Sequence, residues 1–301
     1  MTPARHVQIF LEDGLLDSAQ RRAHNFLGLM QDVLEEAGLT VEFLHENDQP
    51  QMCKGLSLVH MKPPLGRNGL TFRRVCHYPF WQIDRTEQRW AWDVARDHFD
   101  PAAVDTEAAQ KFQRFWRKRL YEADEVTATP NGPIYIPLQG KLTEHRSFQV
   151  MSPVDMVKTT LQLDPNRDVI ATLHPKERYT PAEHVALDKL QDANPRLTVT
   201  IRPPKDILPT CAYVVTENSA VAFDGFLFDK PAILFARIDF HHISQSLTRT
   251  SAEHAFDAVL SDRPDFAKYV HWFWQQKSIN AGRDDAADKI RARFKALGWP
   301  I

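Results

Sequence analysis

Hydrophobic positions along the chain form short runs that alternate with longer segments of helical spacing. The short runs predict strands, and polar or helix-starting residues follow most of them. A parallel α/β sheet produces this alternation, because each strand needs a crossover helix to reach the next. In the first half the predicted strands are 7–11, 41–44, 56–61 and 70–75, and the predicted helices are 19–37, 91–99 and 106–122. In the second half the predicted strands are 134–138, 169–173, 197–201, 212–215 and 232–235, and the predicted helices start at Ser152, Thr180 and Ser219, with a last one at 284–297.

A change of composition at residues 124–133 divides this pattern. The segment DEVTATPNGP has two prolines and a glycine, which predicts an interdomain linker. The predicted fold class is therefore α/β and GT-B-like, with two Rossmann-type domains whose parallel sheets face an interdomain cleft. The expected parts are an N-terminal, acceptor-binding Rossmann-like domain (1–130), a C-terminal, nucleotide-sugar-binding Rossmann-like domain (131–280), and a C-terminal helix (281–301) that packs back on the first domain.

Composition narrows the class of protein. The chain has 301 residues, 43% of them hydrophobic and 25% charged, as in globular proteins with two domains of ordinary size. Its formal net charge of -2 gives no electrostatic reason to expect nucleic acid as a partner. The three cysteines form no CxxC pair, which predicts neither a disulfide framework nor a zinc site. Without a signal-like or membrane-spanning run, the expected location is the cytoplasm.

Candidate chemistry lies where the predicted strands of the second half end. Ligands of open α/β sheets bind outside the carboxyl ends of the strands. His174 follows one strand, with Lys176 beside it, so an imidazole donor and an ammonium are available for a phosphate oxygen. Ser219 begins a helix after another strand, and its hydroxyl with the next backbone N–H groups predicts a second anion site. Taken singly, the two residues are better explained as an exposed loop histidine and a simple helix cap. Together, at strand ends of one sheet, they favour one phosphate-bearing ligand.

Five segments of the second half occur in a characteristic order. They are IYIPLQG (134–140), VMSPVDMV (150–157), IATLHPKE (170–177), LPTCAYVVTENSAVAFDGFLFDKPAILF (208–235) and ARIDFHH (236–242). In this order they resemble the capsule polysaccharide biosynthesis family, whose better-known members transfer Kdo (3-deoxy-D-manno-octulosonic acid). The HP and Ser-containing elements are also similar to the HP and SS/ST motifs of bacterial sialyltransferases, which use CMP-sugars on a GT-B fold.

The resemblance implies a nucleotide site in the second half. By it, His174 contacts the CMP phosphate, Ser219 helps to hold it, and Gln139 and Glu177 line the nucleotide cleft. CMP-sugar transfer has no strict need of a divalent ion, so neither a metal nor a cofactor is expected. The predicted donor-binding residues are Gln139, His174, Pro175, Lys176, Glu177, Asn218, Ser219 and Ala220.

The first half is expected to bind the acceptor and to supply the general base that glycosyl transfer needs. Glu12, Asp13 and Gly14 follow the first predicted strand and resemble the D/E-D/E-G motif of the sialyltransferases, in which an acid is the base. Asp13 is slightly preferred over Glu12, although an ordinary acidic loop explains both equally well. His60 and His77 are alternative bases. Arginines and aromatic side chains could bind an acidic sugar, although core packing explains most of the aromatic ones; the acceptor candidates are Arg73, His77, Trp81 and Arg85.

The expected function is a glycosyltransferase of capsular or lipopolysaccharide biosynthesis that moves Kdo or a related acidic sugar from a CMP-sugar to a glycan or glycolipid. Peripheral contact with the inner face of the membrane fits the basic segment 111–119, which a solvated helix face also explains. Two departures from the family pattern are Thr143, near the place of a usual acid, and Asp224-Gly225, where Glu-Ala is usual. They motivate two alternatives: a transferase that uses a UDP- or GDP-sugar, and a non-catalytic protein of polysaccharide assembly.

Overall fold

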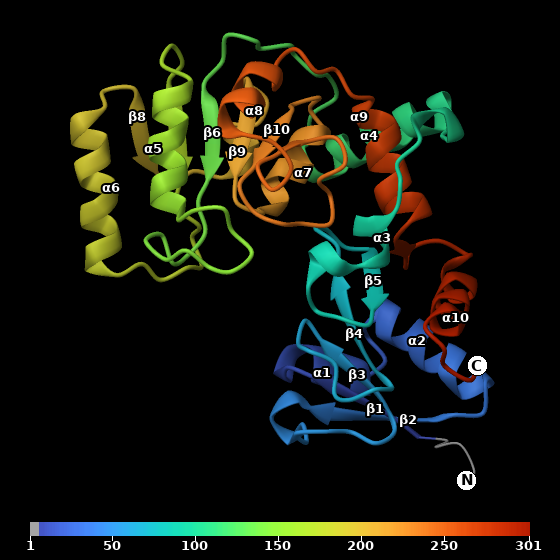
Figure 1. The fold of residues 1–301 in the computed structure, drawn as a ribbon. Coiled ribbons are helices and arrows are strands. Elements are labelled where there is room, and N and C mark those ends of the chain that lie inside the picture. Colours follow the sequence, from blue (N-terminus) through green and yellow to red (C-terminus); the bar gives the residue numbers. More distant parts are fainter. Residues whose placement is uncertain (1–5) are drawn as a thin grey trace. The chain divides into compact units, whose positions relative to one another are not determined.

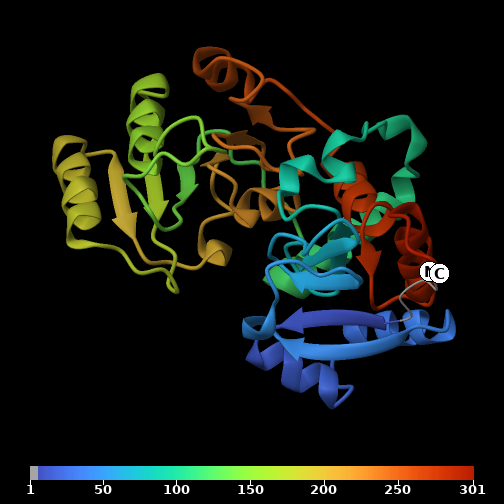
Figure 2. The same cartoon turned by 60° about the horizontal axis from the view of Figure 1, so that its bottom comes forward.

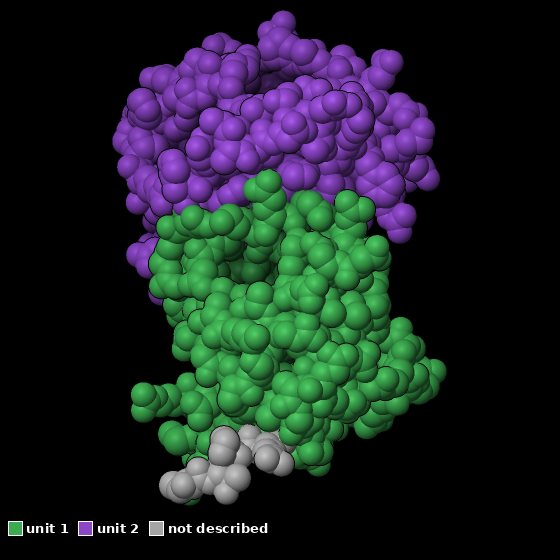
Figure 3. Space-filling model, turned by 90° about the vertical axis from the view of Figure 1, so that its right-hand side faces the viewer, with its two compact units in different colours: residues 1–97, 273–301 green, residues 98–272 purple. Residues whose placement is uncertain are grey.

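The computed structural model describes residues 6–301, and these form two compact units. Unit 1 contains the chain up to Asp97 together with residues 273–301, and unit 2 contains residues 98–272 (Figure 3). Each unit has its own sheet and its own buried core, so each is described by itself.

Unit 1 is built on a six-stranded sheet (Figure 1). Its strand order is β12-β5-β4-β3-β1-β2, in which β2, β1, β3 and β4 are parallel and β5 is antiparallel to both of its neighbours. Figure 2 shows β1 and β2 side by side, paired from His6 with Thr40 to Leu11 with His45. The strands are β1 (His6–Leu11), β2 (Thr40–His45), β3 (Leu56–His60), β4 (Gly69–Arg74), β5 (Phe80–Asp84) and β12 (Ile279–Asn280).

Helices cover this sheet with apolar faces of helical period. The predicted helix 19–37 is two helices, because the chain turns at Arg22, whose φ is +52°, and His24 then caps the next helix through its side chain. The C-terminal helix α10 packs against α2, and its Ile290 and Phe294 are fully buried in the unit 1 core. The helices of unit 1 are α1 (Asp13–Gln20), α2 (Asn25–Glu36), α3 (Asp93–Arg96) and α10 (Ala286–Ala296), with 3₁₀ turns at Glu46–Asp48 and Arg89–Ala91.

Unit 2 is built on a second six-stranded sheet, in which all neighbouring strands are parallel. Its order is β11-β10-β9-β6-β7-β8. The strands are β6 (Ile134–Pro137), β7 (Val169–Thr172), β8 (Leu197–Thr200), β9 (Tyr213–Thr216), β10 (Ala232–Leu234) and β11 (Gln245–Ser246). The helices are α4 (Thr106–Tyr121), α5 (Pro153–Leu163), α6 (Pro181–Ala193), α7 (Ala220–Phe226), α8 (Ala252–Ala258) and α9 (Phe266–Val270), with 3₁₀ turns at Pro101–Ala103 and Pro204–Asp206 and a π-helix at His271–Gln276 that passes into unit 1.

The unit boundary differs from the predicted linker. Residues 98–133 belong to unit 2, since α4 contacts α9 and its Gln113 and Arg117 donate to the carbonyls of Phe226 and Leu227. The segment 124–133 has no helix or strand, as its composition predicts, but it lies on unit 2: the Lys230 ammonium donates to the Thr127 carbonyl at 3.0 Å. The prolines and the glycine of the segment 124–133 therefore indicate irregular backbone, and they do not indicate that the segment lacks contacts with unit 2.

The two mostly parallel sheets with their helices confirm the predicted α/β class of two Rossmann-type units. The strand β5 was not predicted, because it lies inside the aromatic segment and is buried along its whole length, which removes the polar–apolar alternation.

Candidate functional site

Strand order singles out one position at the carboxyl edge of each sheet. Ligands of doubly wound sheets bind where neighbouring strands send the chain to opposite sides, the topological switch point. In unit 1 the chain leaves β1 toward β2 and returns on the other side as β3, so the switch point lies between β1 and β3. In unit 2 it leaves β6 toward β7 and β8 and returns as β9, so the switch point lies between β6 and β9. A residue that binds a ligand is therefore expected to lie close to one of these two points.

The loop after β7 holds His174 in one orientation. The Lys176 backbone N–H donates to His174 Nδ1 at 3.2 Å, and the His174 backbone N–H donates to the Tyr179 hydroxyl at 2.8 Å. Since Nδ1 accepts a hydrogen bond, the proton of the neutral imidazole lies on Nε2. His174 is exposed, so its Nε2–H is available as a donor to a ligand.

The loop after β6 lies against this histidine loop. A Cβ atom on Gly140 would lie 2.5 Å from Glu177 Oε2, so the Glu177 side chain lies directly against the Gly140 backbone. Glu183, at the start of α6, accepts hydrogen bonds from the backbone N–H groups of Leu142 and Thr180. These contacts bring Gln139 and Glu177 to one edge of the sheet.

Ser219 differs from its expected role. It follows β9 at the switch point, is 7% exposed, and its Oγ accepts from the Val221 backbone N–H at 3.3 Å. Its own N–H points to Thr216 Oγ1 at 3.4 Å. Two of the polar groups predicted to bind an anion are thus used to cap α7, which has only seven residues. The Ser219 hydroxyl hydrogen is the part of the predicted anion site that this cap leaves free for a ligand.

The sequence reasoning missed Glu217, which follows β9 directly. It is 3% exposed, and neither carboxyl oxygen has a hydrogen-bond partner within residues 6–301. Burial raises the pKa of Glu217 to about 8, against the smaller opposite effect of the Arg146 charge. An acid directly after a buried strand was the signal in the sequence, but only the nearby hydroxyl of Ser219 was interpreted as part of the site.

In unit 1 the switch point is bridged by Glu12 and His60. Glu12 follows β1, His60 ends β3, and Glu12 Oε2 lies 2.9 Å from His60 Nδ1. The carboxylate can only accept, so Nδ1 donates and the neutral ring has its lone pair on Nε2. Asp13 is placed differently: its side chain is 96% exposed and pairs with His45 Nε2 at 2.9 Å. The sequence slightly favoured Asp13, whereas the structure favours Glu12 as the acid at this switch point.

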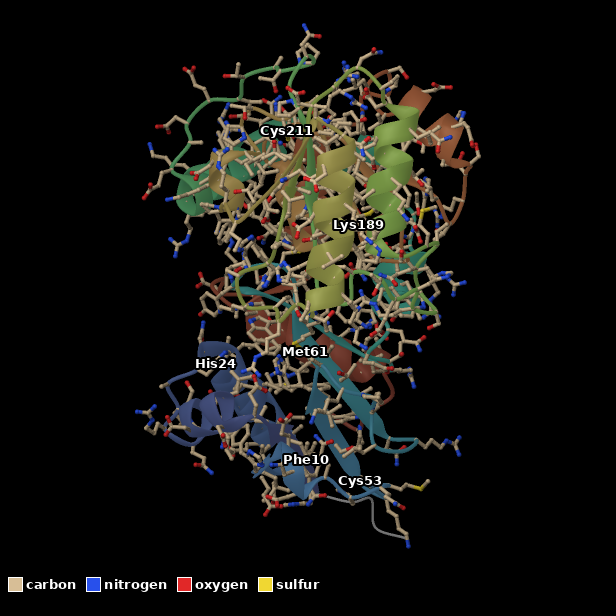
Figure 4. The ribbon with its side chains drawn as sticks, turned by 90° about the vertical axis from the view of Figure 1, so that its left-hand side faces the viewer. Phe10, His24, Cys53, Met61, Lys189 and Cys211 are labelled. Carbon is tan, nitrogen blue, oxygen red and sulfur yellow. The ribbon has the colours of Figure 1, made fainter. Side chains whose placement is uncertain are left out.

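His24 also lies at this edge, as does Met61, whereas Cys53 lies at the opposite end of the sheet (Figure 4). The His24 Nδ1 accepts from the Leu27 backbone N–H at 3.3 Å and so caps α2. Burial lowers the pKa of His24, against the smaller opposite effect of a backbone hydrogen bond. A neutral His24 with a donor Nε2–H is the result.

The four acceptor candidates are not brought together. Trp81 is 3% exposed and stacks on Phe26 with the ring centroids 4.6 Å apart, so it is a core residue and cannot stack on a sugar. Arg85 lies at the other end of the sheet, because β5 is antiparallel and its far end pairs Asp84 with Thr71. The ring of His77 packs edge-on against Trp274 at 5.9 Å. Arg73 is partly exposed and lies near the carboxyl end of β4.

The Asp224-Gly225 departure has a packing reason. A Cβ atom on Gly225 would lie 3.3 Å from Val214 Cγ2, so glycine lets α7 lie close to β9. Asp224 accepts a hydrogen bond from the Tyr121 hydroxyl at 2.7 Å, which ties α7 to α4. This departure therefore reflects how α7 is packed and does not itself indicate a loss of activity.

Within residues 6–301, no three His, Cys, Asp or Glu side chains gather closely enough to hold a metal ion. In the same part of the chain, no helix combines the length and the apolar character that crossing a membrane requires.

Comparison with known proteins gives distant structural likenesses. No protein-family model matches the chain, and no curated protein matches it. Among solved structures, the KpsC β-Kdo 2,7 transferase of Thermosulfurimonas dismutans is similar at 12% identity and a TM-score of 0.49, over 88% of each chain. The KpsC β-Kdo 2,4 transferase of the same organism has 12% identity and a TM-score of 0.48 over 89% of each chain. The UDP-GlcNAc 2-epimerase of Methanocaldococcus jannaschii has 8% identity and a TM-score of 0.38, over 97% of this chain and 100% of that one.

Proposed function

We propose that the protein is a glycosyltransferase that moves Kdo or a related acidic sugar from a CMP-sugar donor to a glycan or glycolipid acceptor of surface polysaccharide synthesis. The observation that carries this proposal is the fixed orientation of His174 at the carboxyl edge of unit 2. Its Nδ1 is occupied by the Lys176 backbone N–H, which leaves an exposed Nε2–H donor where a doubly wound sheet binds its ligand. The order of the five sequence motifs supports a CMP-sugar as that ligand.

In the proposed reaction, unit 2 binds the donor. The bond between the anomeric carbon and the phosphate oxygen breaks, and its electron pair goes to the phosphate. The His174 Nε2–H and the Ser219 hydroxyl donate to the phosphate oxygens, where negative charge develops. Such preorganised donors stabilise the transition state more than the ground state, which is how they raise the rate.

Unit 1 is proposed to bind the acceptor and to take up its proton. The acceptor oxygen forms the new bond to the anomeric carbon, and its proton passes to His60 Nε2. Glu12 holds the imidazole in the tautomer that this step needs, through the 2.9 Å contact with Nδ1. A carboxylate that orients a histidine base in this way is a recurrent catalytic arrangement.

Calorimetric titration with CMP, UMP and GMP tests the donor site. We expect CMP to bind more tightly than the other two nucleotides and His174→Ala to weaken CMP binding at least tenfold, as expected for loss of a hydrogen bond to a charged group. His254→Ala is the matched control, since His254 is an exposed histidine on α8 of the same unit.

The outcomes separate the alternatives. Preference for UMP or GMP would replace the CMP-sugar by a UDP- or GDP-sugar on the same scaffold. Equal CMP binding by wild type and His174→Ala would reject the assigned phosphate site. CMP binding without sugar transfer or donor hydrolysis would favour a non-catalytic protein.

A further inference from the structure

Glu217 is a buried acid that nothing in the fold accounts for. Its carboxyl oxygens are both covered and both lack a hydrogen-bond partner within the described chain. Buried polar groups in proteins almost always have partners, and an unpaired buried carboxylate costs several kcal/mol or more. A structural role would have supplied donors for this carboxylate. The arrangement is therefore that of an uncharged acid, a group awaiting a ligand, or both.

The backbone around Glu217 is firmly held. The Ala236 N–H donates to the Glu217 carbonyl at 3.1 Å, which extends the pairing of β9 with β10 beyond the strand ends. The segment 146–150 runs antiparallel to the residues that directly follow β10. Its Val150 N–H donates to the Phe235 carbonyl at 2.8 Å. Glu217 thus directly follows β9 at the switch point, and residues 235–237 bond both to its backbone and to the segment 146–150.

The charges near Glu217 leave its carboxyl without an ion pair. Arg146 favours the ionised form, but its guanidinium packs over the Phe148 ring at 4.8 Å, and no ion pair between Arg146 and Glu217 forms within 4.0 Å. The His241 Nδ1 donates to the Ile238 carbonyl at 2.8 Å, and burial lowers the pKa of His241, so this ring is neutral. The loops after β6, β7 and β10 bring further titratable or charged groups to this edge, namely Lys141, Glu144, His145, His174, Lys176, Glu177, Arg178, Tyr179, Arg237, Asp239 and His242.

We propose that Glu217 is uncharged in the free protein and donates its carboxyl O–H to a phosphate oxygen of the bound nucleotide. This inference rests on the proposed function and adds a donor that is not among the donor-binding residues predicted from the sequence. An ionised carboxylate two residues before Ser219 would repel the phosphate, whereas the neutral acid offers a hydrogen bond without adding charge. The proton stays on Glu217 throughout. Because both oxygens are covered, the side chain or the segment 146–150 must shift when the contact forms.

This role couples nucleotide binding to a proton. Burial raises the pKa of Glu217 to about 8, so the donor is lost as the pH rises through this value. A nucleotide phosphate has its second pKa near ~6 and histidines titrate near ~6.5, so neither changes its charge appreciably above about pH 7.5. From about pH 7.5 to pH 9.5 the phosphate and the histidines therefore keep a nearly constant charge, and the comparison with Glu217→Gln assigns a change of affinity to Glu217.

The test is calorimetric titration of the whole protein with CMP from about pH 7 to pH 9.5. For wild type we expect the association constant to fall about tenfold per pH unit above about pH 8, the slope of one linked proton. Glu217→Gln has nearly the same shape, keeps an N–H donor and cannot ionise, so its affinity should stay constant within about twofold. The control is Glu144→Gln, which replaces an exposed acid of the loop after β6 that pairs with Lys141, and it should behave as wild type.

Three results decide the matter. A wild-type slope that persists in Glu217→Gln, or a flat wild-type profile, overturns the role of Glu217 and leaves the proposed function standing. A wild-type protein that binds none of CMP, UMP and GMP at any pH overturns the proposed function, and this inference with it. A slope present in wild type and absent only from Glu217→Gln supports the inference.

Discussion

Replacing Glu217 by glutamine should stabilise the protein at alkaline pH and leave its stability nearly unchanged in acid. The carboxyl has an ordinary pKa of 4.5, which the folded protein raises to about 8, chiefly by burial. Below both values the acid is neutral in the folded and the unfolded chain, so burial costs little. Between them the unfolded chain loses the proton while the folded chain keeps it. The folded state therefore loses stability as the pH rises from about 4.5 to about 8.

The size of this effect follows from linkage. Each pH unit between the two pKa values corresponds to about 1.4 kcal/mol, so the whole interval corresponds to roughly 5 kcal/mol. Glutamine has no charge to bury and removes this dependence. The difference in the free energy of unfolding, Glu217→Gln minus wild type, should thus grow by about 1.4 kcal/mol per pH unit from about pH 5 to pH 8 and then level off. Any cost of the unpaired amide is independent of pH and shifts the curve without changing its slope.

Urea denaturation of both proteins at 25 °C, repeated at half-unit steps from about pH 5 to pH 9, measures this difference. The matched control is again Glu144→Gln, whose exposed carboxylate should give a pH-independent difference within about 0.5 kcal/mol. A difference for Glu217→Gln that is constant across this range would mean that Glu217 is ionised in the folded protein. The reasoning from its burial would then be refuted, together with its proposed role as a donor.

Two further predictions concern unit 1. Glu12→Gln should lower the transfer rate by about 10²- to 10⁴-fold and leave the CMP affinity unchanged, because it disturbs the His60 base. Asp13→Asn should have little effect on the transfer rate. Equal losses of rate for both variants in steady-state assays would restore Asp13 as the base. Phe294→Ala should lower the free energy of unfolding by about 3–5 kcal/mol in urea denaturation, since this ring is fully buried and stacks on Trp299 at 4.7 Å. Phe115→Ala, which removes a half-exposed ring, should lower it by less than about 0.5 kcal/mol. A small loss for Phe294→Ala would show that α10 does not stabilise unit 1.

Periodicity located most strands of both sheets to within a residue or two at each end. β7 begins at Val169 and β10 at Ala232, where the apolar runs predict them. The three strands that were not predicted lack a pattern of their own: β5 is buried on both faces, and β11 and β12 have only two residues each. Their places depend on neighbours far away in the chain, which no local pattern contains.

Domain limits were harder for a related reason. Composition reports whether a segment can form helix or strand, but contacts decide to which core it belongs. Thr129 illustrates this, since its hydroxyl donates to the Cys211 carbonyl at 2.7 Å and accepts from the Lys230 ammonium at the same distance. A segment that looks like a linker is held to unit 2 by such bonds.

Strand order explains why the candidate sites were predicted only in part. The sequence shows which polar residues follow strands, and this is enough to select Glu12, His174 and Ser219. It does not show which strands are neighbours, so the pairing of Glu12 with His60 across β1 and β3 requires the fold. Chemistry at a switch point is a property of two loops at once. For that reason Asp13, one residue past Glu12 and exposed to solvent, looked slightly more suitable than Glu12 in the sequence and is less suitable in the structure.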